Sequence, residues 1–275
     1  MCASTGSLNM TPLNMGDTMN RQKFVVAAIV AFSLVDVRVD SRADELPAQG
    51  IALKVCGPEG PAAPMKECAG IFTKLQGQRV EVMAGPEALW TARAKNDADV
   101  IYGGAEYMLS RFISDHSCII EDNTRTSLYN RVGGILVRKG NPKRIKSFSD
   151  LAKDGIRLLE VNGEDEIGLW EDMAGRLGLI PDIRKNIVVS VSSTNQAIEK
   201  WNTTPELDAW ITFESWHYSL KDVTDLVHLP ERERVYRGTP VAAATFYKNR
   251  ESARLFIQFL KTEQCHAVFR KWGWE

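Results

Sequence analysis

From residue 51 onward, short apolar runs alternate with segments whose apolar residues recur at helical spacing. The run at 51–56 predicts a strand, and Met65, Ala69 and Phe72 then lie on one face of a predicted helix. Runs at 79–83 and 99–102 predict two more strands, and each ends, like the first, at a glycine-containing turn. Strand, glycine turn and helix repeated in this order are typical of a parallel α/β sheet.

A second block of the chain repeats this order. It predicts strands at 134–137, 156–161, 187–191 and 208–212, and helices that begin at 148, over 168–177, and after a cap within 192–195. Ser147 and Asp150 have the spacing of a capping box. The tail from 251 is predicted to be helical, and no Ser/Pro-rich linker separates the blocks. Two lobes joined by short crossings are therefore expected.

Length and charge exclude several classes of partner. The chain has 275 residues, 44% of them hydrophobic, which suits two α/β lobes. Lys and Arg number 34 and Asp and Glu 35, for a net charge of −1. No long-range field favours nucleic acid or an anionic membrane surface, so specificity must come from a local site.

The first 43 residues are predicted to be a leader with a secretory signal peptide. Arg21 and Lys23 precede an apolar stretch over 24–35, and a small-x-Ala cleavage pattern ends at Ala43. The stretch is shorter than the roughly 20 residues of a spanning helix. Met19 is the expected start, because nothing before it fits this pattern. An uncleaved anchor and an internal helix are the alternatives.

No pattern predicts a catalytic or metal centre. His-Glu-x-x-His, Gly-x-Ser-x-Gly and P-loop motifs are absent from the sequence. The segment after the leader keeps Cys56, Cys68, Cys118 and Cys265, and no C-x-x-C motif occurs. Export permits disulfides, and four cysteines allow three pairings; buried, unpaired thiols are the alternative.

The glycine turns predict a position for an anion. Helix N-termini at the carboxyl ends of parallel strands present free N–H groups and partial positive charge. Gly57 with Gly60, Gly85, and Gly103 with Gly104 occupy such turns. One turn of this kind is ordinary α/β architecture, whereas three in one lobe suggest a ligand.

At these turns the sequence resembles the accessory-colonisation-factor (AcfC-type) periplasmic solute-binding proteins, which are similar in fold to molybdate- and sulfate-binding proteins. The resemblance spans nearly all of the chain after the leader. The residues that carry it are Gly57-Pro58-Glu59-Gly60-Pro61, Ala84-Gly85-Pro86 with Trp90, 97–101, 104–108, Arg131, 135–142, 168–172, 208–212 and 271–274.

The resemblance implies an α/β, two-lobed type II periplasmic binding protein fold, in which each lobe is a mainly parallel sheet flanked by helices, with two hinge crossings. Lobe 1 would comprise 44–134 plus 236–275, and lobe 2 135–235. It also implies a periplasmic, non-enzymatic component of an ABC importer that binds a sulfate- or molybdate-like oxyanion or a phosphorylated or carboxylated metabolite. The partner would be an inner-membrane permease; no cofactor is implied, and a homodimer is left open.

Carried over position by position, the resemblance places the ligand between both lobes. The implied contacts are Gly57, Pro58, Gly60, Gly85, Pro86, Gly103, Gly104 and Ala105 in lobe 1, and Asn162, Glu164, Asp165, Glu166, Ile167, Gly168 and Thr194 in lobe 2. Arg131, just before the first crossing, is expected to supply a bidentate positive contact. A surface ion pair is its alternative role.

One stretch departs from the family pattern. Where the family reads Asn-Gly-Ala-Gly-Gln-Thr-Gly, residues 162–168 read Asn-Gly-Glu-Asp-Glu-Ile-Gly. The three carboxylates either cap a helix N-terminus, as acids can, or face the cleft and repel an anion. In the second case the site prefers a ligand with a cationic group or has lost binding. A metal site is not favoured, because the alternating ligands of a calcium loop are missing. A surface adhesin with an altered cleft is the alternative function.

Overall fold

The structure, a computed structural model, describes residues 51–245 and 248–275, and these residues belong to the same structural unit. The predicted signal peptide, including the expected start at Met19, lies outside the described residues. Within the described ranges, no helix has the length and apolar character needed to cross a membrane.

The first block folds as the repeated strand–turn–helix pattern predicts. In chain order it contains β1 (Leu53–Gly57), α1 (Ala62–Gln76), β2 (Val80–Ala84), α2 (Glu87–Asn96), β3 (Val100–Tyr102) and α3 (Glu106–Asp115). β1 is parallel to both β2 and β3. Because the carboxyl ends of these strands share one edge, the turns that follow them lie at the same edge.

The second block also alternates strands and helices. It contains β5 (Leu158–Val161), α4 (Leu169–Arg176), α5 (Ile180–Asn186), β6 (Ile187–Val191), α6 (Thr194–Thr203), β7 (Ala209–Phe213), α7 (Ser215–Leu220) and β8 (Thr224–Val227). Short 3-10 helices are η1 (Asp122–Thr124), η2 (Phe148–Ala152), η3 (Glu164–Glu166) and η4 (Glu231–Glu233). β5 is parallel to β6 and β7.

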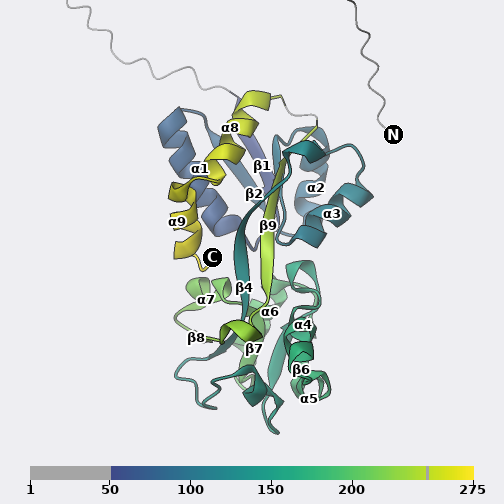
Figure 1. The fold of residues 1–275 in the computed structure, drawn as a ribbon, viewed down its shortest axis with the longest axis vertical. Coiled ribbons are helices and arrows are strands. Elements are labelled where there is room, and N and C mark those ends of the chain that lie inside the picture. The colour runs from purple at the N-terminus through teal and green to yellow at the C-terminus, as the bar shows by residue number, and fades with distance from the viewer. Residues whose placement is uncertain (1–50, 246–247) are drawn as a thin grey trace, which may run out of the picture. The chain divides into compact units, whose positions relative to one another are not determined.

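Two long strands connect the blocks. β4 (Thr126–Arg138) and β9 (Tyr236–Ala243) run side by side and antiparallel through the middle of the fold (Figure 1). β9 also pairs with β3, and β4 with β7, so one sheet has the order β2-β1-β3-β9-β4-β7-β5-β6, with β8 on β4. We call the part built on β1–β3 the first lobe and the part built on β5–β8 the second lobe. The fold is the α/β type II architecture that the resemblance implied, and its crossing strands make the sheet mixed.

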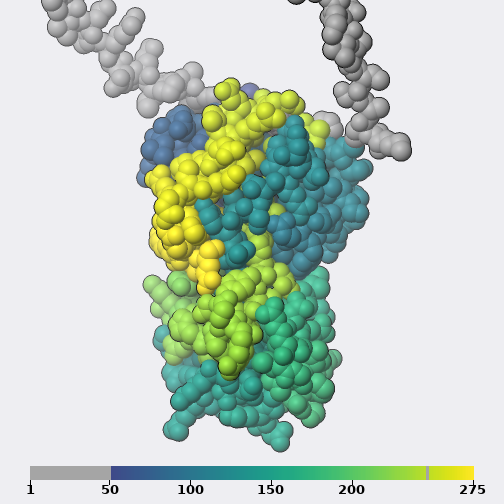
Figure 2. Space-filling view, viewed as in Figure 1, coloured from purple at the N-terminus to yellow at the C-terminus, as the bar shows by residue number. Residues whose placement is uncertain are grey.

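The chain returns to the first lobe at its end. α8 (Arg250–Leu260) and α9 (Glu263–Lys271), yellow in Figure 2, cover part of the first lobe on the face shown. Their apolar faces bury Phe256, Leu260 and Phe269 in a core with α1 and the sheet. The helical tail predicted from 251 is thus two helices, because Thr262 caps the second one by accepting a hydrogen bond from the backbone N–H of Cys265 at 3.4 Å.

Three of the cysteines, Cys56, Cys68 and Cys265, are buried and free. The thiols of Cys68 on α1 and Cys265 on α9 are hydrogen-bonded, and this bond together with burial raises the pKa of Cys68. These residues therefore pack as small apolar side chains, which is the alternative that the sequence left open.

Several predicted boundaries differ from the structure. The strand predicted at 134–137 is only the end of β4, whose first half alternates between partly exposed and exposed residues and so lacks a buried apolar run. The capping box of Ser147 and Asp150 is confirmed, but the helix it opens is the five-residue η2. β9 was not predicted as a segment, since its first residues are polar.

Candidate functional site

A buried arginine lies where the two lobes meet. Arg131, on β4, is 0% exposed, and its guanidinium lies over the ring of Phe213, with 3.9 Å between Cζ and the ring centroid. Its Nη2 donates hydrogen bonds to the carbonyl of Gly104 and to the carboxylate of Asp165. Among the described residues, Nε and Nη1 have no hydrogen-bond partner. Two buried donors of one cation are therefore left for another acceptor.

The first-lobe turns approach this arginine through glycine. A Cβ added to Gly60 would lie 2.6 Å from Nη1 of Arg131 and 2.7 Å from Oδ2 of Asp165. A Cβ added to Gly104 would lie 2.8 Å from the same carboxylate oxygen. Only a residue without a side chain leaves room for this contact between backbone, guanidinium and carboxylate.

The second lobe contributes the acidic segment η3. Asp165 is 2% exposed and Glu166 1%, so both enter the interior, and Asp165 forms a buried ion pair with Arg131. The contact with Asp165 is made by Nη2 alone, so the bidentate contact expected of Arg131 toward a ligand stays a prediction. A surface ion pair, the alternative role of Arg131, is wrong because both partners are buried.

Glu166 is buried against two hydroxyl groups. Its Oε1 accepts hydrogen bonds from the hydroxyls of Thr212 at 2.8 Å and Thr194 at 3.4 Å. Burial, followed by the nearby charge of Asp165, raises its pKa well above the ordinary range. Arg131 and Asp165 lie beside it as a buried pair of opposite charges.

Glu164 connects three elements at the rim of the site. The phenol of Tyr107 on α3 donates to its backbone carbonyl at 2.7 Å, and its Oε2 accepts from the backbone N–H of Thr194 at 3.2 Å. Thr194 is the first residue of α6, so this carboxylate lies at a helix N-terminus. The capping alternative thus applies to Glu164, but the capped helix is α6 and not the α4 that follows in sequence. Burial raises the pKa of Glu164.

The structure brings part of the predicted set together. Gly60, Gly104, Arg131, Glu164, Asp165, Glu166 and Thr194 are connected by the contacts above. The other predicted residues of the first lobe contact different neighbours: Gly57 lies against the ring of Tyr102, Gly103 lies against Pro240, the carbonyl of Gly85 accepts a hydrogen bond from the indole of Trp90, and Pro58 lines a small cavity with Trp90. Pro86 and Ala105 directly precede α2 and α3. In the second lobe, the backbone N–H of Asn162 donates to the carbonyl of Val191, Ile167 is 42% exposed, and Gly168 has a φ of 71° before α4.

Sequence reasoning did not assign Tyr107, Thr212, Phe213 or Trp274 to the site. Thr212 and Phe213 end β7, and Trp274 lies near the guanidinium of Arg131, with 5.7 Å from Cζ to the ring centroid. Each lies within or next to a stretch on which the family resemblance rests. That resemblance is the sequence feature that could have identified them. Their contacts with the site depend on tertiary packing.

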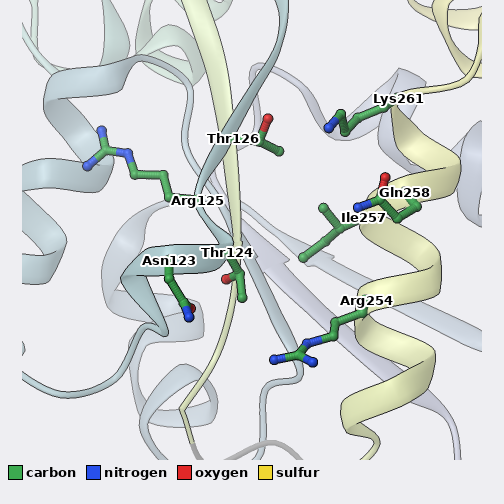
Figure 3. A pocket seen from close by; sticks show the side chains of 8 residues that line it. All are labelled: Asn123, Thr124, Arg125, Thr126, Arg254, Ile257, Gln258 and Lys261. Carbon is green, nitrogen blue, oxygen red and sulfur yellow. The ribbon is translucent and has the colours of Figure 1, made fainter.

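A separate cavity of about 380 Å³ lies between α8 and the start of β4 (Figure 3). Arg125, Arg254 and Lys261 line it, but Arg125 pairs with Glu106 at 2.7 Å and Arg254 with Glu121 at 3.5 Å. None of the predicted site residues lines this cavity. Among the described residues, no group of three His, Cys, Asp or Glu side chains could hold a metal ion.

Glu214, beside the crossing strand β4, gives a testable pH dependence. Burial raises the pKa of its carboxyl to about 7 from 4.5. Between these values the folded protein binds more protons than the unfolded chain, so stability falls as pH rises through this window. We expect Glu214→Gln to remove this loss and to stabilise the protein at pH 8 by about 1 kcal/mol, a value reduced for partial solvation of the carboxyl.

Urea unfolding of both proteins at pH 4.5 and pH 8 measures this difference. Glu199→Gln is the matched control, because Glu199 is an exposed residue of α6. A Glu214→Gln variant with the same pH slope as the wild type would contradict the assignment.

Known proteins share this fold and part of this sequence. Peb3 from Campylobacter jejuni is 31% identical, with a TM-score of 0.74, over 81% of this chain and 99% of that chain. The sulfate-binding protein SubI from Mycobacterium tuberculosis H37Rv (16% identity, 82% of this chain, 86% of that chain, TM-score 0.68) and the Azotobacter vinelandii molybdate-binding protein (17%, 81% and 98%, TM-score 0.62) share the fold.

A match by sequence alone is shorter. A sulfate-binding protein from Synechococcus elongatus is 25% identical in an alignment of 164 positions that covers 52% of this chain and 46% of that protein, so the chain spans about half the length of this relative. Residues 53–275, which include both lobes and the crossing strands, match the family described as bacterial extracellular solute-binding protein. The chain therefore belongs to the bacterial extracellular solute-binding protein family.

Proposed function

We propose that this protein is the periplasmic receptor of an ABC importer and binds a small anion at Arg131, between the turns of Gly60 and Gly104. The observation that carries this proposal is the buried guanidinium of Arg131, whose Nε and Nη1 have no hydrogen-bond partner among the described residues. Backbone from the first lobe and η3 from the second surround it. An arginine in this setting recognises a planar carboxylate or a phosphoryl or sulfuryl group.

The comparisons support an anionic ligand. A crystal structure of PEB3 holds L-phospholactate, which carries a phosphate and a carboxylate, and the relatives above include proteins named for sulfate and molybdate. We therefore favour a phosphorylated or carboxylated metabolite, with a tetrahedral oxyanion next. The AcfC-type motifs around Gly57–Gly60 and Gly104–Met108 agree with this class.

Transport would use motion between the lobes. We place the boundaries at 44–134 with 236–275 and at 135–235, so that β4 and β9 act as the hinge crossings. Ligand binding would draw the lobes together, as in other two-lobed receptors, and the closed form would then bind a permease in the inner membrane.

Thermal-shift and calorimetric measurements with phosphoglycerate, phospholactate, citrate, sulfate and molybdate test the proposal. A ligand that binds only the native state must raise the melting temperature. Arg131→Lys, which keeps the charge but loses the planar fork, should weaken binding of the stabilising anion at least tenfold. Arg138→Lys is the matched control, since Arg138 also lies on β4 and over an aromatic ring, that of Trp201, with 3.8 Å to the centroid. If no anion stabilises the folded protein, the proposal is wrong.

One observation favours a second function. Asp165 already pairs with the arginine, as expected of a surface adhesin whose cleft no longer takes up a solute. Host-surface binding that is unchanged by Arg131→Lys, together with no anion binding, would support the adhesin over the receptor.

A further inference from the structure

The carboxylate of Asp165 lies in the place that an anionic ligand of Arg131 would take. It contacts the guanidinium and lies close to the backbone of both glycine turns: a Cβ on Gly60 or on Gly104 would come within 2.8 Å of its Oδ2. Arginine, glycine backbone and carboxylate thus form the contacts expected between this site and a bound acid. The acid here belongs to the protein.

The charges of the buried site are already balanced. Arg131 carries one positive charge, Asp165 one negative charge, and Glu166 has a raised pKa because it is buried beside Asp165. An anion added next to this pair would leave an uncompensated negative charge in the interior, which is costly. A solute anion and the Asp165 carboxylate therefore exclude each other at Arg131.

Asp165 also joins the lobes. It belongs to η3 of the second lobe, whereas Gly60 and Gly104 belong to turns of the first. The hydrogen bond from Tyr107 on α3 to the carbonyl of Glu164 adds a second connection across the same boundary, at 2.7 Å. These contacts join the two lobes through groups of the protein itself.

We infer that Asp165 is an intramolecular ligand of Arg131, which keeps the unliganded site closed and must leave before an anionic solute binds. This inference rests on the proposed anion-binding function of the same site. A tethered group competes at an effective concentration in the millimolar range or above. The apparent affinity for a solute is therefore the intrinsic affinity multiplied by the fraction of molecules in which the carboxylate is displaced.

The competition selects the solute. A monocarboxylate makes the same contacts with Arg131 as Asp165 does, so replacing Asp165 by such a solute gives no net gain in binding free energy. A phosphate ester or sulfate has further oxygens, which can accept from the Nε and Nη1 donors that Asp165 leaves without partners. The wild-type site should therefore bind oxyanions with several acceptor oxygens and discriminate against acetate.

Asp165→Gly tests this inference, with acetate, sulfate and phosphoglycerate as probes. The variant should have a lower melting temperature without anion, since Arg131 is left unpaired. It should bind sulfate or phosphoglycerate at least tenfold more tightly than the wild type, and acetate should stabilise it at concentrations that leave the wild type unchanged. Asp165→Asn, which keeps the shape, should show the same gain in affinity for sulfate.

Asp172→Asn is the control for the loss of one negative charge in the same lobe, because Asp172 pairs with Arg237 and is 53% exposed. It should bind each probe as the wild type does. Tight wild-type binding with no gain in either Asp165 variant would overturn the inference and leave the receptor function standing. Folded wild type and variants that bind no probe would overturn both.

Discussion

Replacing Arg131 with methionine is expected to destabilise the protein by about 3–5 kcal/mol, because the Asp165 carboxylate is then left buried without its cation. Both side chains are nearly inaccessible to solvent, at 0% and 3% exposure. The loss cannot be relieved by a small rotation of Asp165, since its neighbours are the backbone of Gly60 and Gly104 and the acidic Glu166. Equilibrium unfolding in urea, monitored by circular dichroism, measures the change.

The double variant Arg131→Met, Asp165→Asn separates the charge effect from lost packing. Removing both charges should recover much of the stability, because a buried ion pair can be replaced by uncharged groups at little net cost. The coupling energy of the two substitutions should be well above about 1 kcal/mol, as it is for groups in direct contact. If the double variant loses as much unfolding free energy as the two single variants lose together, the two side chains do not interact.

Replacing Gly60 with alanine is expected to abolish anion binding and to destabilise the protein by about 1–3 kcal/mol, the usual cost of overpacking an interior. The added Cβ would lie 2.6 Å from Arg131 Nη1, so either the arginine or the turn must move. Arg131 is confined by the ring of Phe213, and the displacement therefore spreads to the lobe boundary. Calorimetry with the stabilising anion and urea unfolding measure the two effects.

Gly70→Ala is the matched control for this change. Gly70 lies within α1, and a Cβ there would meet nothing within 4 Å. Alanine should stabilise this helix by up to about 1 kcal/mol relative to glycine and leave binding unchanged. If Gly60→Ala were as stable and as competent in binding as Gly70→Ala, the close approach at Gly60 would have no functional meaning.

The periodicity of apolar residues was sufficient to predict most of the architecture. β1, β5 and β7 are short, mostly buried runs, β6 alternates between partly exposed and exposed residues, and apolar residues at helical spacing indicated the helices. These patterns are local, because a strand or a helix places its side chains by the geometry of its own backbone. β9 and the first half of β4 lacked such a pattern, and their pairing partners come from distant parts of the chain.

By itself, the sequence predicted the α/β class and the glycine turns, since both depend on residue type and order, whereas Arg131 as a ligand contact was implied only by the family resemblance and stays a prediction. Only the tertiary structure decided that Asp165, 34 positions further along the chain, neutralises that arginine, while Glu166 turns to Thr212 and Glu164 to the start of α6. Because the three acidic residues are adjacent, their local sequence does not distinguish their roles. Their different environments arise because lobes distant in sequence meet at η3, and burial and opposite charge act only through that contact.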